Sequence, residues 1–117
     1  MISQSLAQEV SLLEANLCSA LADPTRILIL YALNEKPLSV TEILNELSIP
    51  QSMASRHLKV LRDSGLVNTH RRGSSIIYRL TDKQVIQALD LLRGVMRTSI
   101  QRQATLMKEL VTPVYVK

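Results

Sequence analysis

The stretch from Ser39 to Leu80 decides the fold, and it reads SVTEILNELSIPQSMASRHLKVLRDSGLVNTHRRGSSIIYRL. It predicts two short helices joined by a tight turn, followed by a β-hairpin with two arginines near its tip. Ser39 and Glu42 have the spacing of a capping box, so the first helix begins after Ser39 and runs to about Leu47. Pro50 ends the turn, since proline fixes φ and favours an extended residue before it.

The second helix, from Gln51 to about Ser64, has one apolar face and one polar, basic face. Ala54, Leu58 and Leu61 follow helical spacing and form the inner face. The outer and flanking side chains are Gln51, Ser52, Ser55, Arg56, Lys59 and Arg62. A helix of this kind sits on a small core and offers its outer face to DNA. Gly65 suits a left-handed residue directly after the helix.

Two β-forming segments follow, from Leu66 to Arg71 and from Ser75 to Leu80. Arg72-Gly73-Ser74 makes the hairpin turn, in which Gly73 can take a positive φ. Two helices joined by a short turn and followed by a hairpin form a winged helix-turn-helix. In this arrangement the second helix enters the major groove of DNA, and basic side chains of the hairpin reach neighbouring phosphates or the minor groove.

Amphipathic helices are predicted on both sides of this stretch. From 5 to 21 one apolar stripe is formed by Leu6, Val10, Leu13, Leu17 and Leu21. A long last helix, from 82 to about 110, has a second stripe at Val85, Leu89, Leu92, Met96 and Ile100. Thr81 to Gln84 has the pattern of a capping box for this helix, and Thr112-Pro113 ends it.

Asp23 and Pro24 mark the start of one more helix, because Asp accepts from free backbone N–H groups and Pro fits the first turn. This helix, from Pro24 to Asn34, is apolar nearly all round and is expected to be the central core helix. The fold class is therefore mostly α with a β-hairpin wing, in one domain over residues 1–117.

The positive charge of the chain is concentrated in one segment. The net charge is +4, and residues 51–80 alone hold six basic side chains and one acid. Such a patch is the electrostatic footprint of a phosphate-binding surface, although a solvated basic face has the same composition. Aromatic residues make up 3% of the chain, which disfavours stacking on single-stranded nucleic acid. The expected partner is double-stranded DNA.

Hydrophobic residues make up 46% of this short chain, which favours burial of apolar surface against a second copy. The single cysteine excludes an intrachain disulfide. No signal peptide is recognised, and the longest apolar run, Ile27 to Leu33, is too short to span a bilayer. A cytoplasmic protein without a membrane partner is expected.

The segments LADPTRILIL (21–30), SVTEILNEL, QSMASRHLKVLRDSGLV and RRGSSIIYRL together resemble the ArsR family of winged-helix repressors over about residues 17–92. The resemblance implies a homodimer, with helices 5–21 and 82–110 as the dimer layer, that binds an inverted-repeat operator and is released by a signal. The DNA-contacting positions that it implies are Gln51, Ser52, Ser55 and His57 in the second helix and Arg71 and Arg72 at the wing tip. Arg56 and Lys59 join this set because they lie on the polar face. Pro50 departs from the family, where relatives often have a serine cap.

No metal or other cofactor is expected. Residues 41–47 lack the cysteines that metal-sensing members carry there, and Asp90 has no histidine to pair with in residues 81–117, whereas a metal site needs three or four ligands. Cys18 is expected to be a small buried apolar residue; the alternative is a redox sensor that meets its copy across the dimer axis. The apolar stripes can also frame a pocket for a small organic effector.

Two other classes of function compete with the repressor hypothesis. A winged helix can serve as a protein–protein module, but such a module would expose apolar residues on the outer face, where only Met53 comes close. An enzyme is not expected, since the chain has no paired carboxylates, Ser-His-Asp order, Cys-His pair at plausible spacing or glycine-rich phosphate loop. The sequence therefore predicts a sequence-specific DNA-binding repressor that does not respond to metal.

Overall fold

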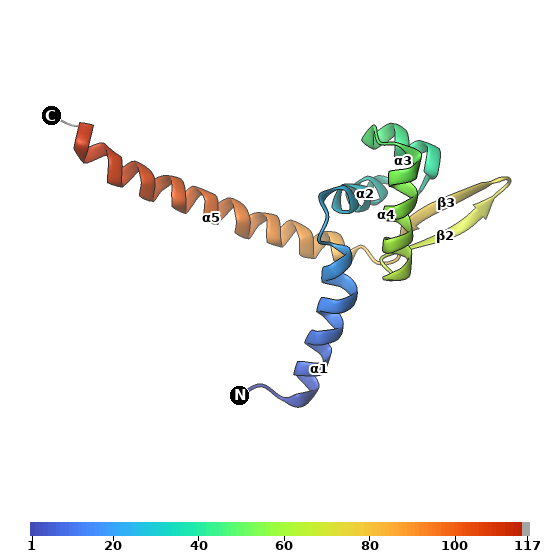
Figure 1. Cartoon of the computed structure of the whole chain (residues 1–117), viewed down its shortest axis with the longest axis horizontal. Coiled ribbons are helices and arrows are strands. Elements are labelled where there is room, and N and C mark those ends of the chain that lie inside the picture. The colour runs from blue at the N-terminus through green and yellow to red at the C-terminus, as the bar shows by residue number, and fades with distance from the viewer. Residues whose placement is uncertain (116–117) are drawn as a thin grey trace. The chain divides into compact units, whose positions relative to one another are not determined.

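The computed structural model describes the backbone of residues 1–115 and the side chains of residues 1–110. The chain forms two compact units, Met1–Lys83 and a second unit that begins at Gln84. In chain order the elements are α1 (Gln4–Leu12), the π-helix η1 (Leu13–Cys18), α2 (Pro24–Glu35), β1 (Leu38–Ser39), α3 (Val40–Leu47), α4 (Gln51–Asp63), β2 (Val67–Arg72), β3 (Ser75–Leu80) and α5 (Gln84–Tyr115) (Figure 1). The predicted winged helix-turn-helix, mostly α with a hairpin wing, is confirmed.

The helix-turn-helix forms where the local sequence predicts it. Ser39 Oγ accepts a hydrogen bond from the Glu42 N–H at 3.2 Å, and Glu42 Oε1 accepts one from the Ser39 N–H at 2.8 Å, so the first capping box is confirmed. Ser48 takes a left-handed φ of 54° after α3, and α4 begins directly after Pro50. Gly65 follows α4 with a φ of +82°, as expected.

Helices α2, α3 and α4 contribute to one core. Its fully buried large side chains are Ile29, Leu30, Ile43, Leu58 and Leu61. Each of these side chains stabilises the fold by about 1.5–3 kcal/mol relative to an exposed position. Because Ala54 is buried with Leu58 and Leu61, the predicted inner face of α4 is confirmed. This burial fixes which side chains of α4 point outward.

The wing is part of a three-stranded antiparallel sheet with the strand order β1-β3-β2. The hairpin turns at Gly73, whose φ of 62° is positive as predicted. Arg72 was expected in the turn but belongs to β2, where it pairs with Ser75. The sequence does not predict β1, because two residues are too few for an alternating pattern and pairing with Ile77 and Tyr78 depends on tertiary structure. Successive side chains of a strand point to opposite faces, so Arg71 and Arg72 of β2 face opposite ways.

The predicted helix over 5–21 is wrong in detail, because α1 passes into the π-helix η1. There the Ser19 N–H donates to the Glu14 carbonyl, five residues back, and apolar periodicity does not reveal such a local change. The expected central core helix, α2, does pack in the core against α3, α4 and β3, but it is not buried all round, since Leu28 is 57% exposed. The small core covers only one face of α2, the face with Ile29, Leu30 and Leu33.

Both predicted ends of the last helix differ from the observed ones. Thr81 does not cap α5, because its N–H donates to the Leu66 carbonyl at 3.1 Å and its Oγ1 accepts from Asn68 Nδ2 at 3.3 Å. The helix therefore begins at Gln84. It continues through Pro113 to Tyr115, where the missing N–H of proline removes a single hydrogen bond near the helix end.

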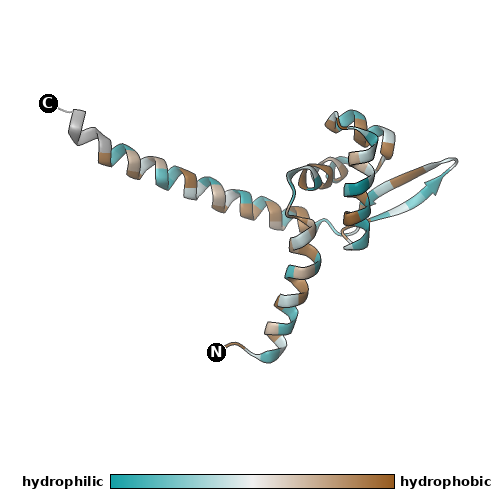
Figure 2. Ribbon diagram, in the orientation of Figure 1, coloured by the Kyte–Doolittle hydropathy of each residue, from teal (hydrophilic) through white to brown (hydrophobic). Residues whose placement is uncertain are grey.

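Apolar side chains are exposed along both terminal helices. Leu6 and Val10 are exposed in α1, and Leu92, Met96 and Ile100 of α5 are between 53% and 62% exposed. Figure 2 shows hydrophobic positions recurring along the lengths of α1 and α5. Among the described residues, no helix is long and apolar enough to cross a membrane.

Candidate DNA-binding surface

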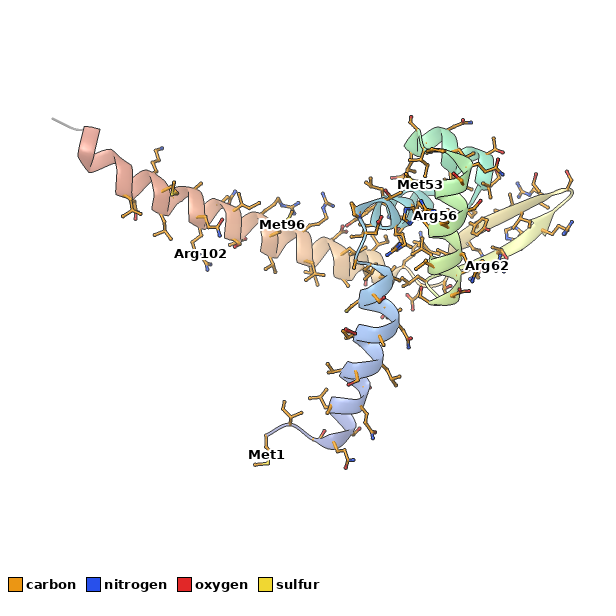
Figure 3. All side chains as sticks on the ribbon, viewed as in Figure 1. Met1, Met53, Arg56, Arg62, Met96 and Arg102 are labelled. Atoms are coloured by element: carbon orange, nitrogen blue, oxygen red, sulfur yellow. The ribbon has the colours of Figure 1, made fainter. Side chains whose placement is uncertain are left out.

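The outward side of α4 presents a polar and basic surface. Its exposed side chains, which we call the α4 outer face, are Gln51, Ser52, Ser55, Arg56, Lys59 and Arg62. Figure 3 labels Met53, Arg56 and Arg62 along this helix. Met53 is half-buried, and no large apolar side chain between Gln51 and Lys59 is exposed; Val60, beside this face, is 37% exposed. This composition fits a polyanion better than an apolar protein partner.

The cations of the α4 outer face differ in how far they are neutralised. Lys59 Nζ donates to Asp63 Oδ2 at 2.8 Å, one helical turn away, and both side chains are exposed. Within the described part of the chain, the Arg56 and Arg62 side chains make no ion pair or hydrogen bond. The guanidinium groups of the two arginines are therefore available to donate to a phosphate or a base edge, whereas Lys59 would first have to break its ion pair with Asp63.

The wing adds two further cations at its tip. Arg71 and Arg72 are both exposed and lie just before the turn at Gly73. Arg72 is opposite Ser75, and Arg71 is opposite Ile76. Because their side chains leave opposite faces of the hairpin, the two arginines present different surfaces to a bound ligand.

His57 is placed differently from the other residues expected at the DNA. Its side chain is 12% exposed, and its Nε2 lies 3.8 Å from Asp23 Oδ1. Arg26 Nη1 lies 3.1 Å from His57 Nδ1. Since arginine can only donate, Nδ1 is the acceptor and Nε2 carries the proton on the side of Asp23. The ring thus joins α4 to the start of α2.

Arg26 and Asp23 extend this contact into a small network that connects three segments. Arg26 Nε donates to the Ala20 carbonyl at 2.6 Å, and its Nη2 donates to the Ser19 carbonyl at 3.4 Å. Asp23 Oδ1 accepts from the N–H groups of Thr25 and Arg26 at 2.8 and 3.3 Å, which confirms it as the N-cap of α2. The sequence gives Asp23 this role but no role to Arg26; the only signal was a cation in the first turn of a mostly apolar helix.

The carboxylate of Asp23 is stabilised in its ionised form. Partial desolvation raises its pKa, but the N–H donors of Arg26 and Thr25 and the electrostatic effect of the nearby His57 and Arg26 side chains outweigh this, so the pKa lies below the usual 3.8. The network therefore favours a charged Asp23 at neutral pH.

Cys18, the last residue of η1, is exposed. The expectation of a buried apolar cysteine is therefore wrong for this chain, because η1 contributes no buried residue. Among the described residues, no three or more His, Cys, Asp and Glu side chains gather in a group able to hold a metal ion.

Comparison with known proteins gives a family match and several similar sequences. Residues 23–69 match the family described as "Bacterial regulatory protein, arsR family". The chain is 44% identical over 88 residues to the HTH-type transcriptional regulator NmtR of Mycobacterium tuberculosis, covering 75% of this chain and 69% of NmtR. It is 37% identical over 90 residues to the biofilm growth-associated repressor of Xylella fastidiosa, covering 77% and 78% of the two chains.

A solved structure is similar over most of its length. The homodimeric winged helix-turn-helix DNA-binding domain Mb0332 of Mycobacterium bovis superimposes with a TM-score of 0.72 at 26% identity. The match covers 86% of this chain and 93% of that domain. The similarity thus extends beyond the helix-turn-helix itself.

Proposed function

Because the chain belongs to the ArsR family of DNA-binding transcriptional regulators, we propose that it is a repressor that binds an inverted-repeat operator as a homodimer. The α4 outer face carries the proposal: its polar and basic side chains are exposed while the opposite face of the same helix is buried. The name of the Xylella relative supports the direction of regulation.

In this proposal α4 lies in the major groove, which is wide enough for one helix. Gln51, Ser52 and Ser55 are short polar side chains near its N-terminus and allow close approach to base edges. Arg56 is long enough to reach a base or a phosphate. The phosphate contacts proposed for the flanks are those of Lys59, Arg71 and Arg72. The partly buried His57 supports α4 through Arg26.

The homodimer is proposed from the apolar side chains that α1 and α5 leave exposed, Leu6 and Val10 in one helix and Leu92, Met96 and Ile100 in the other. Covering such surfaces with a second copy removes them from water. The Mycobacterium bovis domain, described as homodimeric, supports this assignment. Two copies of α4 related by a twofold axis would then read an inverted repeat.

We infer that the controlling signal is not a metal ion. Residues 41–47 contain no cysteine or histidine, and the described residues contain no metal-ligand group. A small organic effector is the signal that we propose instead, with oxidation of Cys18 as the alternative.

The test is a binding titration with a duplex from the DNA upstream of the protein's own gene and a shuffled duplex at the same salt. Binding to the upstream duplex should be roughly a thousandfold tighter or more, and it should be unchanged by a chelator. Equal affinities would favour the protein-interaction module. Release by chelator would contradict the metal-independent signal, and release by an oxidant would make Cys18 the sensor.

Deleting the gene should raise expression from the bound promoter; a fall would make the protein an activator.

A further inference from the structure

A cavity of about 300 Å³ lies where the wing approaches the start of α3. Its lining comes from the segment after α2, the first turn of α3 and the strands of the wing, and consists of Lys36, Pro37, Glu42, His70, Arg72 and Ile77. The strand register explains this convergence. His70 is directly opposite Ile77, and Arg72 lies two residues further along the same face. Ile77 also pairs with Ser39, which places the start of α3 next to this face.

The lining has a surplus of positive charge. Lys36 and Arg72 are cations, and Glu42 is the only carboxylate. Within the described part of the chain, the side chains of Lys36, His70 and Arg72 make no hydrogen bond or ion pair. Their donors are therefore available to a ligand from outside.

Glu42 does not neutralise the positive charge of Lys36 and Arg72. Its Oε1 accepts from the Ser39 N–H at 2.8 Å, so one oxygen is committed to the capping box. The backbone N–H of Ser39, together with the weaker effect of the charges on Lys36 and Arg72, holds the pKa of Glu42 below its usual value. A neighbouring hollow shares Lys36 and Glu42 but is also lined by Glu46. Two carboxylates disfavour an anion in that hollow. Of the two, the cavity lined by the wing is therefore the more positive one.

We propose that this cavity binds a phosphate group held by Lys36, His70 and Arg72. The donors come from two segments, Lys36 at the end of α2 and both His70 and Arg72 on β2. They suit the several oxygens of a phosphate, and arginine can donate two parallel hydrogen bonds to it. The phosphate comes either from the DNA backbone or from a free small anion. A free anion would occupy Arg72 and so weaken DNA binding. Binding of a DNA backbone phosphate rests on the proposed function, whereas binding of a free anion does not.

The first arm of the test uses DNA-free protein and inorganic phosphate at constant ionic strength, followed by backbone amide chemical shifts. Saturable shifts are expected around residues 36, 42 and 70–72. Lys36→Gln should abolish them, and Lys83→Gln should not, since the exposed Lys83 does not line the cavity. Glu42→Gln should bind phosphate more tightly, because glutamine keeps the capping box and removes the negative charge. Shifts that survive in Lys36→Gln would contradict the site.

The second arm measures affinity for the upstream duplex over a range of salt concentrations. If a DNA phosphate occupies the cavity, Lys36→Gln lowers the slope of log affinity against log salt by about 0.9, and Lys83→Gln leaves it unchanged. A change in slope alone assigns the DNA backbone, phosphate binding alone assigns a free anion, and both together assign one site to both sources. No Lys36-dependent change in either arm overturns the proposal. If the wild-type protein does not prefer the upstream duplex, the proposed function fails while the first arm still decides this site.

Discussion

At the scale of single residues, His57 links the two helices that set the direction of the α4 outer face. Its ring lies between Arg26 and Asp23, and Arg26 also holds two backbone carbonyls of the preceding turn. A charge pair with only partial burial contributes little by itself. The network therefore acts mainly by fixing geometry, because α4 cannot rotate on α2 without separating these groups.

The lowered pKa of Asp23 predicts a loss of stability in acid. The folded state binds this proton less readily than the unfolded state, so the contribution is complete above about pH 3.8 and is lost as the pH falls through the lower folded-state value. Asp23→Asn retains a capping side chain and should flatten the acid fall in unfolding free energy, measured by urea titrations between about pH 5 and 2. The exposed Asp63→Asn is the control; a variant curve parallel to wild type would contradict the role of Asp23.

Ser55 tests whether the α4 outer face reads bases. Ser55→Ala should reduce discrimination between operator and shuffled DNA by about 1–3 kcal/mol if its hydroxyl contacts a base edge. The measurement is the ratio of the two dissociation constants at one salt concentration. Arg62→Ala, near the far end of the helix, should weaken both complexes alike. An equal loss on both duplexes for Ser55→Ala would exclude base reading.

At the scale of elements, α3 depends on its capping box. Ser39→Ala removes the acceptor for the Glu42 N–H and should lower the free energy of unfolding by about 1 kcal/mol. Thermal or urea unfolding gives the value, with Thr41→Ala as a control at an exposed position of the same helical turn. Equal stability of the two variants would show that the capping box observed here contributes nothing.

The elements that could be predicted from the sequence are those defined by local chemistry. The capping box at Ser39, the left-handed Gly65 and the apolar spacing of α4 each depend on neighbouring residues, and each is confirmed. The pairing of β1 with β3 and the bonds that hold Thr81 join distant segments, so no local pattern reveals them.

The candidate site divides in the same way. Helical periodicity places five polar side chains on or beside one face of α4, and all five are exposed as expected: Gln51, Ser52, Ser55, Arg56 and Lys59. The position of His57 was not predictable, because it lies at the edge of the inner face and its partner Arg26 is 31 residues away in sequence. The cavity between Lys36 and Arg72 likewise depends on the strand register rather than on a motif.

At the scale of the whole molecule, exposed apolar side chains on α5 predict a second copy. Ile100 is 56% exposed, and a charge there would lose its hydration when a second copy covers this surface. Ile100→Glu should shift the mass measured by light scattering toward the 13.1 kDa of one chain and weaken operator binding. Gln101→Glu adds the same charge at the neighbouring exposed position and should remain dimeric. A dimeric Ile100→Glu protein would place the interface elsewhere.

A hydroxyl-radical footprint of the wild-type protein on the DNA upstream of its gene tests directly whether a dimer reads DNA through α4. Two copies that each place α4 in the major groove predict two protected blocks related by an inverted repeat, with centres about one helical turn or a multiple of it apart. Ser55→Ala should weaken both blocks together. Uniform protection without a repeat, or no protection at concentrations that saturate binding, would contradict a dimeric repressor that reads DNA through α4.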